Sequence, residues 1–405
     1  MQSVPLPTFS RRGFLNLTLA ASAAAACGTI FSERLLARSH DKPFPKDAVV
    51  IDANENPLGP SQGAREAVAA IIANGGRYSP WLTDELIETF AAMEGLQPDY
   101  VTAYPGSSEP LHYAVLAFSS ASKSFVSADP GYEAGRHAAE SAGARIVNVP
   151  LAKDYSHDVK AMLAAAPDAG VFYVCTPNNP TGTLTRHADI EYLVERKPQG
   201  SIVLVDEAYI HFADGAASAT DLARAGKDVI VLRTCSKIYG MAGLRCGFAI
   251  GRPELMAKIH SFQGWNAMPI TAVVAANASL KDPNLVPERK HINAATRETV
   301  FEWLRQNGYT FIPSQSKCFM LDTRRDGKQA LQAMQKQNVY VGRIWPVMPT
   351  YVRVTVGTPA EMDRFQVAFN SLMKGTVVSR VRRGSRLPGR YVDGLRVPHG
   401  TNELV

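Results

Sequence analysis

The chain has 405 residues, of which 46% are hydrophobic and 20% charged, so it is not intrinsically disordered and is long enough for two domains. Lysine plus arginine number 43 and aspartate plus glutamate 37, a formal net charge of +6. Much of the excess lies in a basic C-terminal run, residues 376–405, which indicates a solvated tail and not a nucleic-acid site.

The N-terminus carries the pattern of an export signal. Ser10-Arg11-Arg12-Gly13-Phe14-Leu15 places two arginines before a mostly apolar run that ends at Ile30. Residues 1–38 are therefore predicted to be a twin-arginine signal with its linker, and the protein to be periplasmic or otherwise exported. An amphipathic N-terminal helix is the alternative, and Cys27 offers a lipoprotein anchor, although the usual preceding leucine is missing. The run is too short and alanine-rich for a comfortable membrane span, and no stable span is expected once the signal is removed.

The cysteines do not suggest a metal centre or a disulfide framework. Their number is odd and none form a CxxC pair. We expect four of them to be small buried hydrophobic residues, and we expect no metal site. These four are Cys175, Cys235, Cys246 and Cys318.

The middle of the chain alternates β-branched apolar runs with helical patterns such as 186–196. Runs that are apolar throughout suit strands buried on both faces of a parallel sheet. The predicted fold class is therefore α/β, a mostly parallel central sheet with crossover helices, plus a smaller α+β domain. The predicted strands are 124–128, 145–149, 171–175, 202–205, 229–232 and 247–250.

The pattern changes near Pro283, where a long helix over 289–307 leads to short strands at 317–322 and 352–356. We predict a large domain over 75–283. The smaller domain is predicted to combine 46–74 with 284–375.

Two predicted loops carry groups suited to an anion. Gly106-Ser107-Ser108-Glu109 opens a helix that is predicted to run to about Ser120, and helix N-termini expose unpaired N–H groups. Thr176-Pro177-Asn178-Asn179-Pro180-Thr181-Gly182 follows a buried strand and supplies amide donors. A plain N-cap and an asparagine-rich turn are the ordinary alternatives.

Two further segments carry ionisable groups at strand ends, where open α/β sheets bind ligands. Asp206 ends a wholly apolar strand, and a buried carboxylate needs a partner. Lys237 lies among hydroxyl residues, eight positions before Arg245, where a lysine of lowered pKa forms a Schiff base. A helix cap and a surface lysine are the alternatives for these two residues. Neither GxGxxG after a strand nor GxxxxGK[ST] is present, which argues against a nicotinamide dehydrogenase.

In this order and spacing, the segments resemble the fold type I pyridoxal-phosphate aminotransferases of class I/II, particularly histidinol-phosphate aminotransferases. The resemblance runs from about Asp52 to Thr358. The motifs that carry it are Asp52-Ala-Asn-Glu-Asn-Pro-Leu-Gly-Pro-Ser61, Arg77-Tyr78, Gly106-Ser-Ser-Glu109, Thr176-Pro-Asn-Asn-Pro-Thr-Gly182, Asp206-Glu-Ala-Tyr209, Ser236-Lys237 with Arg245, and Arg353-Val-Thr-Val-Gly357.

The resemblance implies a catalytic set of Lys237, Asp206 and Tyr209. Lys237 would hold pyridoxal 5'-phosphate as a Schiff base and, once displaced, move the substrate's α-proton. Asp206 would keep the pyridine nitrogen protonated. Asn179 and Tyr209 would donate to the phenolate oxygen of the ring.

The resemblance also implies the remaining contacts. Tyr132 would stack on the ring, and Tyr78 would reach the phosphate from a neighbouring subunit, which implies a homodimer. Arg353 would bind the substrate carboxylate as a two-pronged donor, and Arg343 and Asn56 would also bind substrate. The residues implied to hold the cofactor phosphate are Ser107, Ser108, Thr234, Ser236 and Arg245.

The implied activity is amino transfer from an amino acid or related amine to a 2-oxo acid. Arg343-Ile344-Trp345-Pro346 departs from the surroundings of the arginine that histidinol-phosphate aminotransferases often carry for the substrate phosphate. With the export signal, this departure indicates an aromatic or otherwise specialised amino donor, for which Trp81, Trp265 and Trp345 offer a pocket lining if they are not ordinary core residues. Decarboxylase or lyase chemistry on the same cofactor is the alternative, and a non-catalytic binding protein is disfavoured by the intact lysine, aspartate and arginine set.

Overall fold

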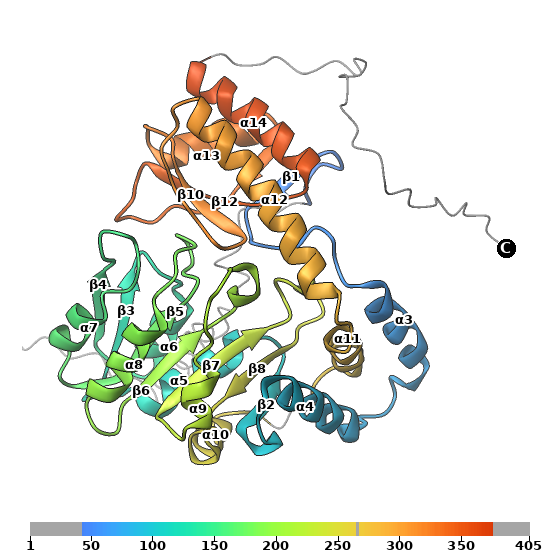
Figure 1. The fold of residues 1–405 in the computed structure, drawn as a ribbon, viewed down its shortest axis with the longest axis vertical. Helices are drawn as coiled ribbons and strands as arrows, with labels where there is room; N and C mark the ends of the chain where they lie inside the picture. Colours follow the sequence, from blue (N-terminus) through green and yellow to red (C-terminus); the bar gives the residue numbers. More distant parts are fainter. Residues whose placement is uncertain (1–42, 265–266, 376–405) are drawn as a thin grey trace, which may run out of the picture.

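The computed structural model describes residues 43–264 and 267–375. The predicted export signal with Cys27, the basic tail and Trp265 lie outside the described residues. Figure 1 shows a large sheet flanked by helices, with a smaller layer of strands and helices packed above it. None of the helices in the described ranges is both long enough and apolar enough to cross a membrane.

The large sheet has seven strands in the order β2-β8-β7-β6-β5-β3-β4. Only β8 runs against its neighbours, so the sheet is mostly parallel. The strands are β2 Val101–Tyr104, β3 Ser124–Asp129, β4 Ile146–Pro150, β5 Ala169–Cys175, β6 Ile202–Asp206, β7 Val229–Thr234 and β8 Gly247–Ile250.

Helices cover both faces of this sheet, which explains why its inner strands are apolar throughout. Along β6, Ile202 and Leu204 pack on one face, against α5, α6 and α10. Val203 and Val205 pack on the other, in a core shared with α4, α7, α8, α9 and α11. These helices are α4 Pro80–Glu94, α5 Ser108–Phe118, α6 Ala134–Ser141, α7 Val159–Ala165, α8 His187–Arg196, α9 Thr220–Arg224, α10 Pro253–His260 and α11 Ile270–Leu280.

The smaller layer combines the two ends of the described chain. Strand β1, Val49–Ile51, pairs in parallel with β11, Val339–Val341, and its side chains join a core formed with the C-terminal helices. A second small sheet has the order β12-β10-β9. Its elements and the helices on it are β9 Phe311–Ile312, β10 Cys318–Asp322, β12 Tyr351–Thr355, α12 Leu285–Gln306, α13 Gly327–Gln335 and α14 Pro359–Lys374.

The predicted α/β class is confirmed, and some local details differ from the predictions. Strand β2 was not predicted, because it is only four residues long and lies at the edge of the sheet. Helix α12 begins at Leu285, four residues before the predicted start, since Pro287 is tolerated in a first turn, where its missing N–H costs nothing. Helix α5 ends at Phe118.

Helix α3, Gln62–Ile71, lies inside the range predicted for the smaller domain. It contacts α11, and its Ala64 belongs to the core of the large sheet. The domain boundaries stay a prediction.

Candidate active site

Three parallel strands end at one cavity. Cys175, Asp206 and Thr234 are the last residues of β5, β6 and β7, and all three side chains line a cavity of about 200 Å³. The carboxyl edge of a parallel sheet is where α/β proteins bind small molecules. Lys237 lines the same cavity, so the sheet brings the predicted lysine and aspartate together.

Most of the predicted site residues converge on this cavity although they come from many segments. Arg343 and Arg353 belong to the smaller layer, and the others come from the large sheet and its loops. The predicted residues that line the cavity are Ser107, Ser108, Tyr132, Asn179, Asp206, Tyr209, Thr234, Ser236, Lys237, Arg245, Arg343 and Arg353.

One end of the cavity is built for an anion. Arg245 donates through Nη1 to Oγ of Ser236 at 3.2 Å, and Oγ1 of Thr234 bonds the same oxygen at 3.0 Å. The first turn of α5 opens beside them, and Ser107 makes no side-chain cap there. Gly106 has φ of +97°, and a Cβ at this position would lie 2.3 Å from Nη2 of Arg245. Only glycine therefore lets the guanidinium approach the start of the helix so closely.

The carboxylate of Asp206 is held by two donors. Tyr173 donates its hydroxyl to Oδ2 at 2.8 Å, and the N–H of Ala208 donates to Oδ1 at 3.0 Å. Burial, and then the nearby Asp206 charge, raise the pKa of Tyr173 well above its ordinary value, so its hydroxyl remains a donor at neutral pH. Sequence reasoning missed Tyr173, because its role depends on the neighbouring strand.

Tyr209 is fixed by Asn54, a residue from the N-terminal arm to which the sequence analysis gave no role. Nδ2 of Asn54 donates to the Tyr209 hydroxyl oxygen at 3.0 Å, and burial raises the pKa of Tyr209 well above its ordinary value. Asn54 has φ of +55°, a conformation that asparagine tolerates better than most residues. It is bonded through both its N–H and its Oδ1 to Oγ1 of Thr355, at 2.9 Å each. The Asp-Ala-Asn motif was the sequence-level signal available.

Arg353 crosses from the smaller layer to the large domain. Its Nη1 donates to Oδ1 of Asn179 at 2.9 Å and its Nη2 to the carbonyl of Asp52 at 2.5 Å. The buried Nε has no hydrogen-bond partner among the described residues. Burial lowers the pKa of Arg353 from its ordinary value, but a guanidinium remains charged in proteins. Arg353 therefore offers the cavity a buried positive charge, and its Nε–H is a donor that a ligand could still use.

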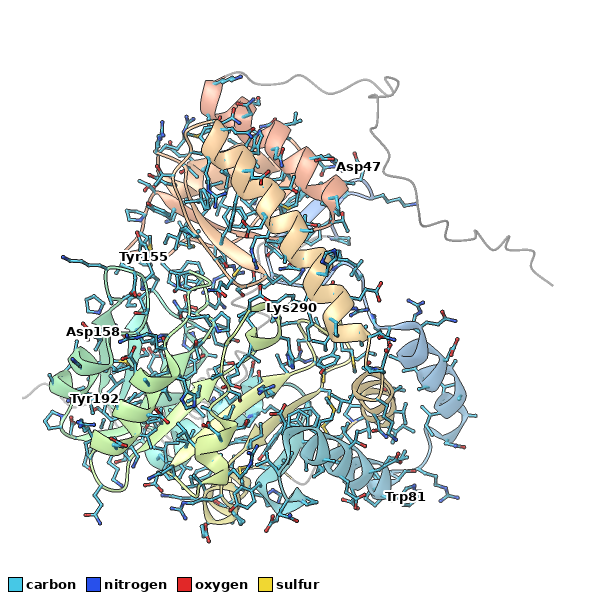
Figure 2. The ribbon with its side chains drawn as sticks, viewed as in Figure 1. Asp47, Trp81, Tyr155, Asp158, Tyr192 and Lys290 are labelled. Carbon is cyan, nitrogen blue, oxygen red and sulfur yellow. The ribbon has the colours of Figure 1, made fainter. Side chains whose placement is uncertain are left out.

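Several predicted residues do not meet at the cavity. Tyr78 is 84% exposed in the single chain. Asn56 instead donates to the carbonyl of Ile238 at 3.1 Å and lines a smaller neighbouring cavity with Arg289 and Lys317. Trp81 is 64% exposed and lies on α4 at the outer edge of the molecule (Figure 2). Trp345 is buried in a small core with Ile312 and Met320, so neither of these two predicted tryptophans lines the cavity.

The fold and these residues define a pyridoxal-phosphate enzyme. The anion cradle, the carboxylate of Asp206 and the amine of Lys237 match the phosphate, the ring nitrogen and the aldehyde of this cofactor. The chain belongs to the aminotransferase class I and II family, whose model matches residues 46–369.

Curated relatives agree with this family. A histidinol-phosphate aminotransferase from Symbiobacterium thermophilum is 33% identical over 81% of this chain and 91% of its own length. An aromatic amino acid aminotransferase from Cutibacterium acnes is also 33% identical, over 82% and 94%. The histidinol-phosphate aminotransferase of Sinorhizobium meliloti, solved with pyridoxal-5'-phosphate, shares the fold with a TM-score of 0.76 and 23% identity, over 87% of this chain and 97% of that one. The chain is therefore an aminotransferase that uses pyridoxal phosphate.

Proposed function

We propose that this enzyme transfers the amino group of an α-amino acid, with an aromatic donor as the first candidate, to a 2-oxo acid. The observation that carries this proposal is the pair of arginines that line one cavity from different parts of the fold: Arg245, bonded to Ser236 beside the α5 N-terminus, and Arg353 from the smaller layer. Two such cations suit a cofactor phosphate and a substrate carboxylate bound in the same cavity.

We assign the cofactor contacts from the same geometry. Arg245, Ser236, Thr234 and the first turn of α5 would bind the phosphate oxygens. Asp206, oriented by Tyr173 and Ala208, would accept a hydrogen bond from the pyridine N–H. The further assignments are Tyr132 on the face of the ring, Asn179 and Tyr209 at its phenolate oxygen, and Ser107 and Ser108 at the phosphate.

When bound, pyridoxal phosphate supplies a carbonyl carbon that takes over the amino group and a ring that withdraws electrons from the substrate. Nζ of Lys237 would anchor the cofactor covalently and, once an amino substrate has displaced it, remove the proton from the substrate Cα. Its position above the Tyr209 ring, 5.7 Å from Nζ to the centroid, is consistent with this role. The same amine would then deliver the proton to the cofactor carbon that takes over the amino group.

Arg353 would orient the substrate carboxylate. Its two bonds, to Asn179 and to the Asp52 carbonyl, fix the guanidinium plane before substrate arrives, which lowers the entropy lost on binding. Histidinol phosphate has no α-carboxylate, so this assignment favours an α-amino acid as donor.

A half-reaction assay tests the proposal. The purified holoenzyme is mixed with L-phenylalanine, L-tryptophan, L-histidine or histidinol phosphate, and the loss of the cofactor's visible absorbance is followed. Pyruvate or 2-oxoglutarate is then added to restore it. Stoichiometric amino transfer from an amino acid is the expected result, and release of carbon dioxide or ammonia instead would contradict it.

We also propose a homodimer in which Tyr78 completes the partner's site. The high exposure of Tyr78 beside the similarly exposed Trp81 supports an interface there. Co-expression of Lys237→Ala and Tyr78→Ala subunits tests it, because a mixed dimer regains one intact site containing Lys237 of one subunit and Tyr78 of the other. A mixture no more active than the separate variants would contradict the shared site.

Finally, we propose export by the twin-arginine route, which rests on residues 10–30 of the sequence alone. The test replaces Arg11 and Arg12 by lysine and follows the protein by cell fractionation. Retention of the variant in the cytoplasm is expected, and unchanged export would contradict the proposal.

A further inference from the structure

Two arginines of the smaller layer, Arg353 and Arg343, line the cavity, and Arg343 is already paired with a carboxylate of the protein. Arg343, two residues beyond β11, lines the cavity, and its Nη2 bonds Oε2 of Glu133. Glu133 directly follows Tyr132 and precedes α6. Both side chains remain partly open to solvent, at 22% and 21% exposure. The charge of Arg343 is therefore balanced by a neighbour that is not part of any substrate.

Arg343 and Arg353 both lie over the ring of Trp345, but they differ in their hydrogen-bond partners. The guanidinium carbon lies 4.8 Å from the Trp345 ring centroid for Arg343 and 5.8 Å for Arg353. Arg353 donates to two uncharged oxygens, of Asn179 and of the Asp52 carbonyl, whereas Arg343 is bonded to a carboxylate. Arg353 therefore keeps its positive charge for an incoming carboxylate, and Arg343 has its charge compensated.

The pair is not needed to hold its loop in place. The carbonyl of Gly131 accepts from Nε1 of Trp345 at 2.9 Å, and that of Ala128 accepts from Nη2 of Arg136 at 3.0 Å. Arg136 also lies 3.5 Å from Asp129. These contacts fix the segment on either side of Tyr132 without Glu133. Glu133 therefore acts on the cavity through Arg343, which lines it.

We infer that Glu133 is a specificity-determining residue, which holds Arg343 as an internal counter-ion and directs the site toward substrates whose side chain carries no negative charge. The inference rests on the proposed function and narrows its substrate class. A donor with a distal phosphate or carboxylate reaches Arg343 only by displacing Glu133, which leaves that carboxylate beside the bound anion. A neutral side chain leaves the pair intact. The same reasoning favours pyruvate over 2-oxoglutarate as acceptor.

The experiment compares donors in the half-reaction of the holoenzyme. The measured quantity is the ratio of kcat/KM for L-aspartate to kcat/KM for L-phenylalanine. Glu133→Gln keeps the shape of the side chain but removes its charge, and should raise this ratio about tenfold, equivalent to about 1.4 kcal/mol. Arg343→Gln should lower the ratio, because it leaves the Glu133 carboxylate uncompensated, and adding Glu133→Gln should bring the ratio back toward the wild-type value without exceeding it.

Glu140→Gln is the matched control. Glu140 lies on α6, the helix that Glu133 precedes, and pairs with His137 at the surface, so its loss should not change the ratio. A Glu133→Gln enzyme whose ratio stays within about twofold of the wild type overturns the inference. So does an equal loss of rate with every donor, which is the signature of a purely structural role. A wild-type enzyme that prefers aspartate to phenylalanine overturns it while amino transfer stands, whereas a wild type inert to every amino donor overturns the proposed function itself.

Discussion

Arg353 donates to the side-chain oxygen of Asn179 at 2.9 Å, across 174 residues of chain. This bond joins β12 of the smaller layer to the loop that follows β5 of the large sheet. It places Arg353, proposed to bind the substrate carboxylate, in direct contact with Asn179, proposed to bind the cofactor. Substrate and cofactor would therefore be positioned by one shared polar unit.

Lys237→Ala should abolish the visible absorbance of the bound cofactor and lower turnover by about 10⁴-fold or more, since the covalent anchor and the proton carrier are lost together. Spectra before and after borohydride treatment measure the first effect. The surface variant Lys281→Ala, which loses only an exposed pair with Glu85, serves as control. An absorbing, fully active Lys237→Ala enzyme would refute the assignment.

Arg353→Lys should weaken use of amino and oxo acids while leaving cofactor content unchanged. Lysine keeps the positive charge, but its single ammonium group cannot bond Asn179 and the Asp52 carbonyl and also bind a carboxylate at two points. Loss of one charged hydrogen bond predicts a fall in kcat/KM of about 30-fold, or about 2 kcal/mol. The measurement is steady-state kinetics alongside cofactor titration, and an unchanged KM for the amino acid would count against the carboxylate role.

Tyr173→Phe should reduce turnover about tenfold without changing the amount of bound cofactor, because Asp206 loses the hydroxyl that donates to its Oδ2. The spectrum of the bound cofactor, titrated with pH, should shift if Asp206 acts on the ring nitrogen. Tyr113→Phe, which removes a hydroxyl bonded to Glu109, is a matched control. Identical titration curves for wild type, Tyr173→Phe and Tyr113→Phe would contradict the assignment of Asp206 to the ring nitrogen.

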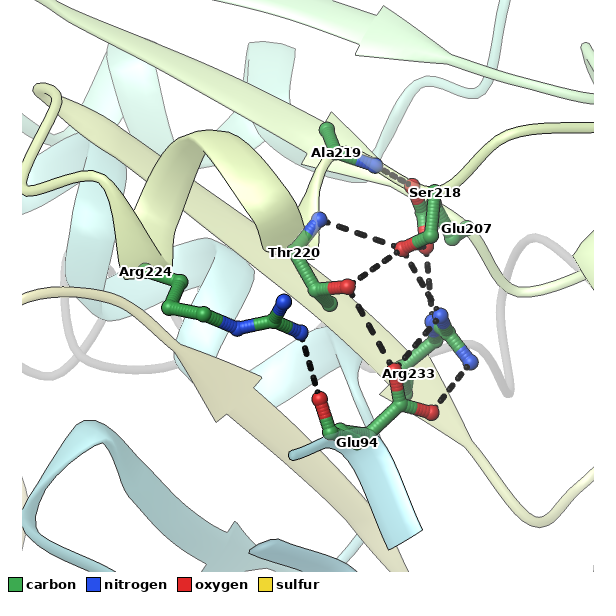
Figure 3. A network of polar contacts seen from close by, with 7 residues as sticks. All are labelled: Glu94, Glu207, Ser218, Ala219, Thr220, Arg224 and Arg233. Atoms are coloured by element: carbon green, nitrogen blue, oxygen red, sulfur yellow. Dashed lines mark hydrogen bonds and ion pairs between the residues drawn. The ribbon is translucent and has the colours of Figure 1, made fainter. Parts of the chain in front are cut away.

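Glu207→Gln should destabilise the fold. Arg233 is buried and donates to Glu207 at 2.7 Å, to Glu94 at 3.2 Å and to Ser218 at 2.9 Å, in the network of Figure 3. Removing one partner of a buried ion pair costs about 3 kcal/mol, which denaturant unfolding measures. Glu195→Gln, at an exposed pair with Arg196, should change stability by less than about 1 kcal/mol. Equal losses of stability in Glu207→Gln and Glu195→Gln would show that the buried network contributes no more to stability than an exposed ion pair.

Lys317 should make stability depend on pH. Burial lowers the pKa of Lys317 to about 8, so the folded state carries the full cost of this charge below pH 8. Between pH 8 and the ordinary lysine range the unfolded chain binds the extra proton, and wild-type stability should rise by up to about 3 kcal/mol. The stability of Lys317→Met relative to wild type should therefore fall as pH rises from 8 to 10. A difference that is constant with pH would contradict the lowered pKa.

Some parts of the fold were predictable because their signal is local. Strand β6 reads Ile-Val-Leu-Val before Asp206, and residues that are apolar on both faces indicate a strand covered by helices on both sides. Strand β2 gave no such signal, because four residues at a sheet edge need only a partner strand. Trp81 and Trp345 looked equally suited to a pocket, yet one is exposed and the other buried, since burial depends on neighbours distant in sequence.

The sequence by itself determined the α/β class, the family and the cofactor chemistry, because these follow from residues whose spacing along the chain is short, such as Ser236, Lys237 and Arg245. Only the tertiary structure decided which side chains hold the reactive groups: Tyr173 on Asp206, Asn54 on Tyr209 and Glu133 on Arg343. The last two contacts span 155 and 210 residues. Such contacts are set by strand order and by the docking of the smaller layer on the large sheet, which no local pattern encodes.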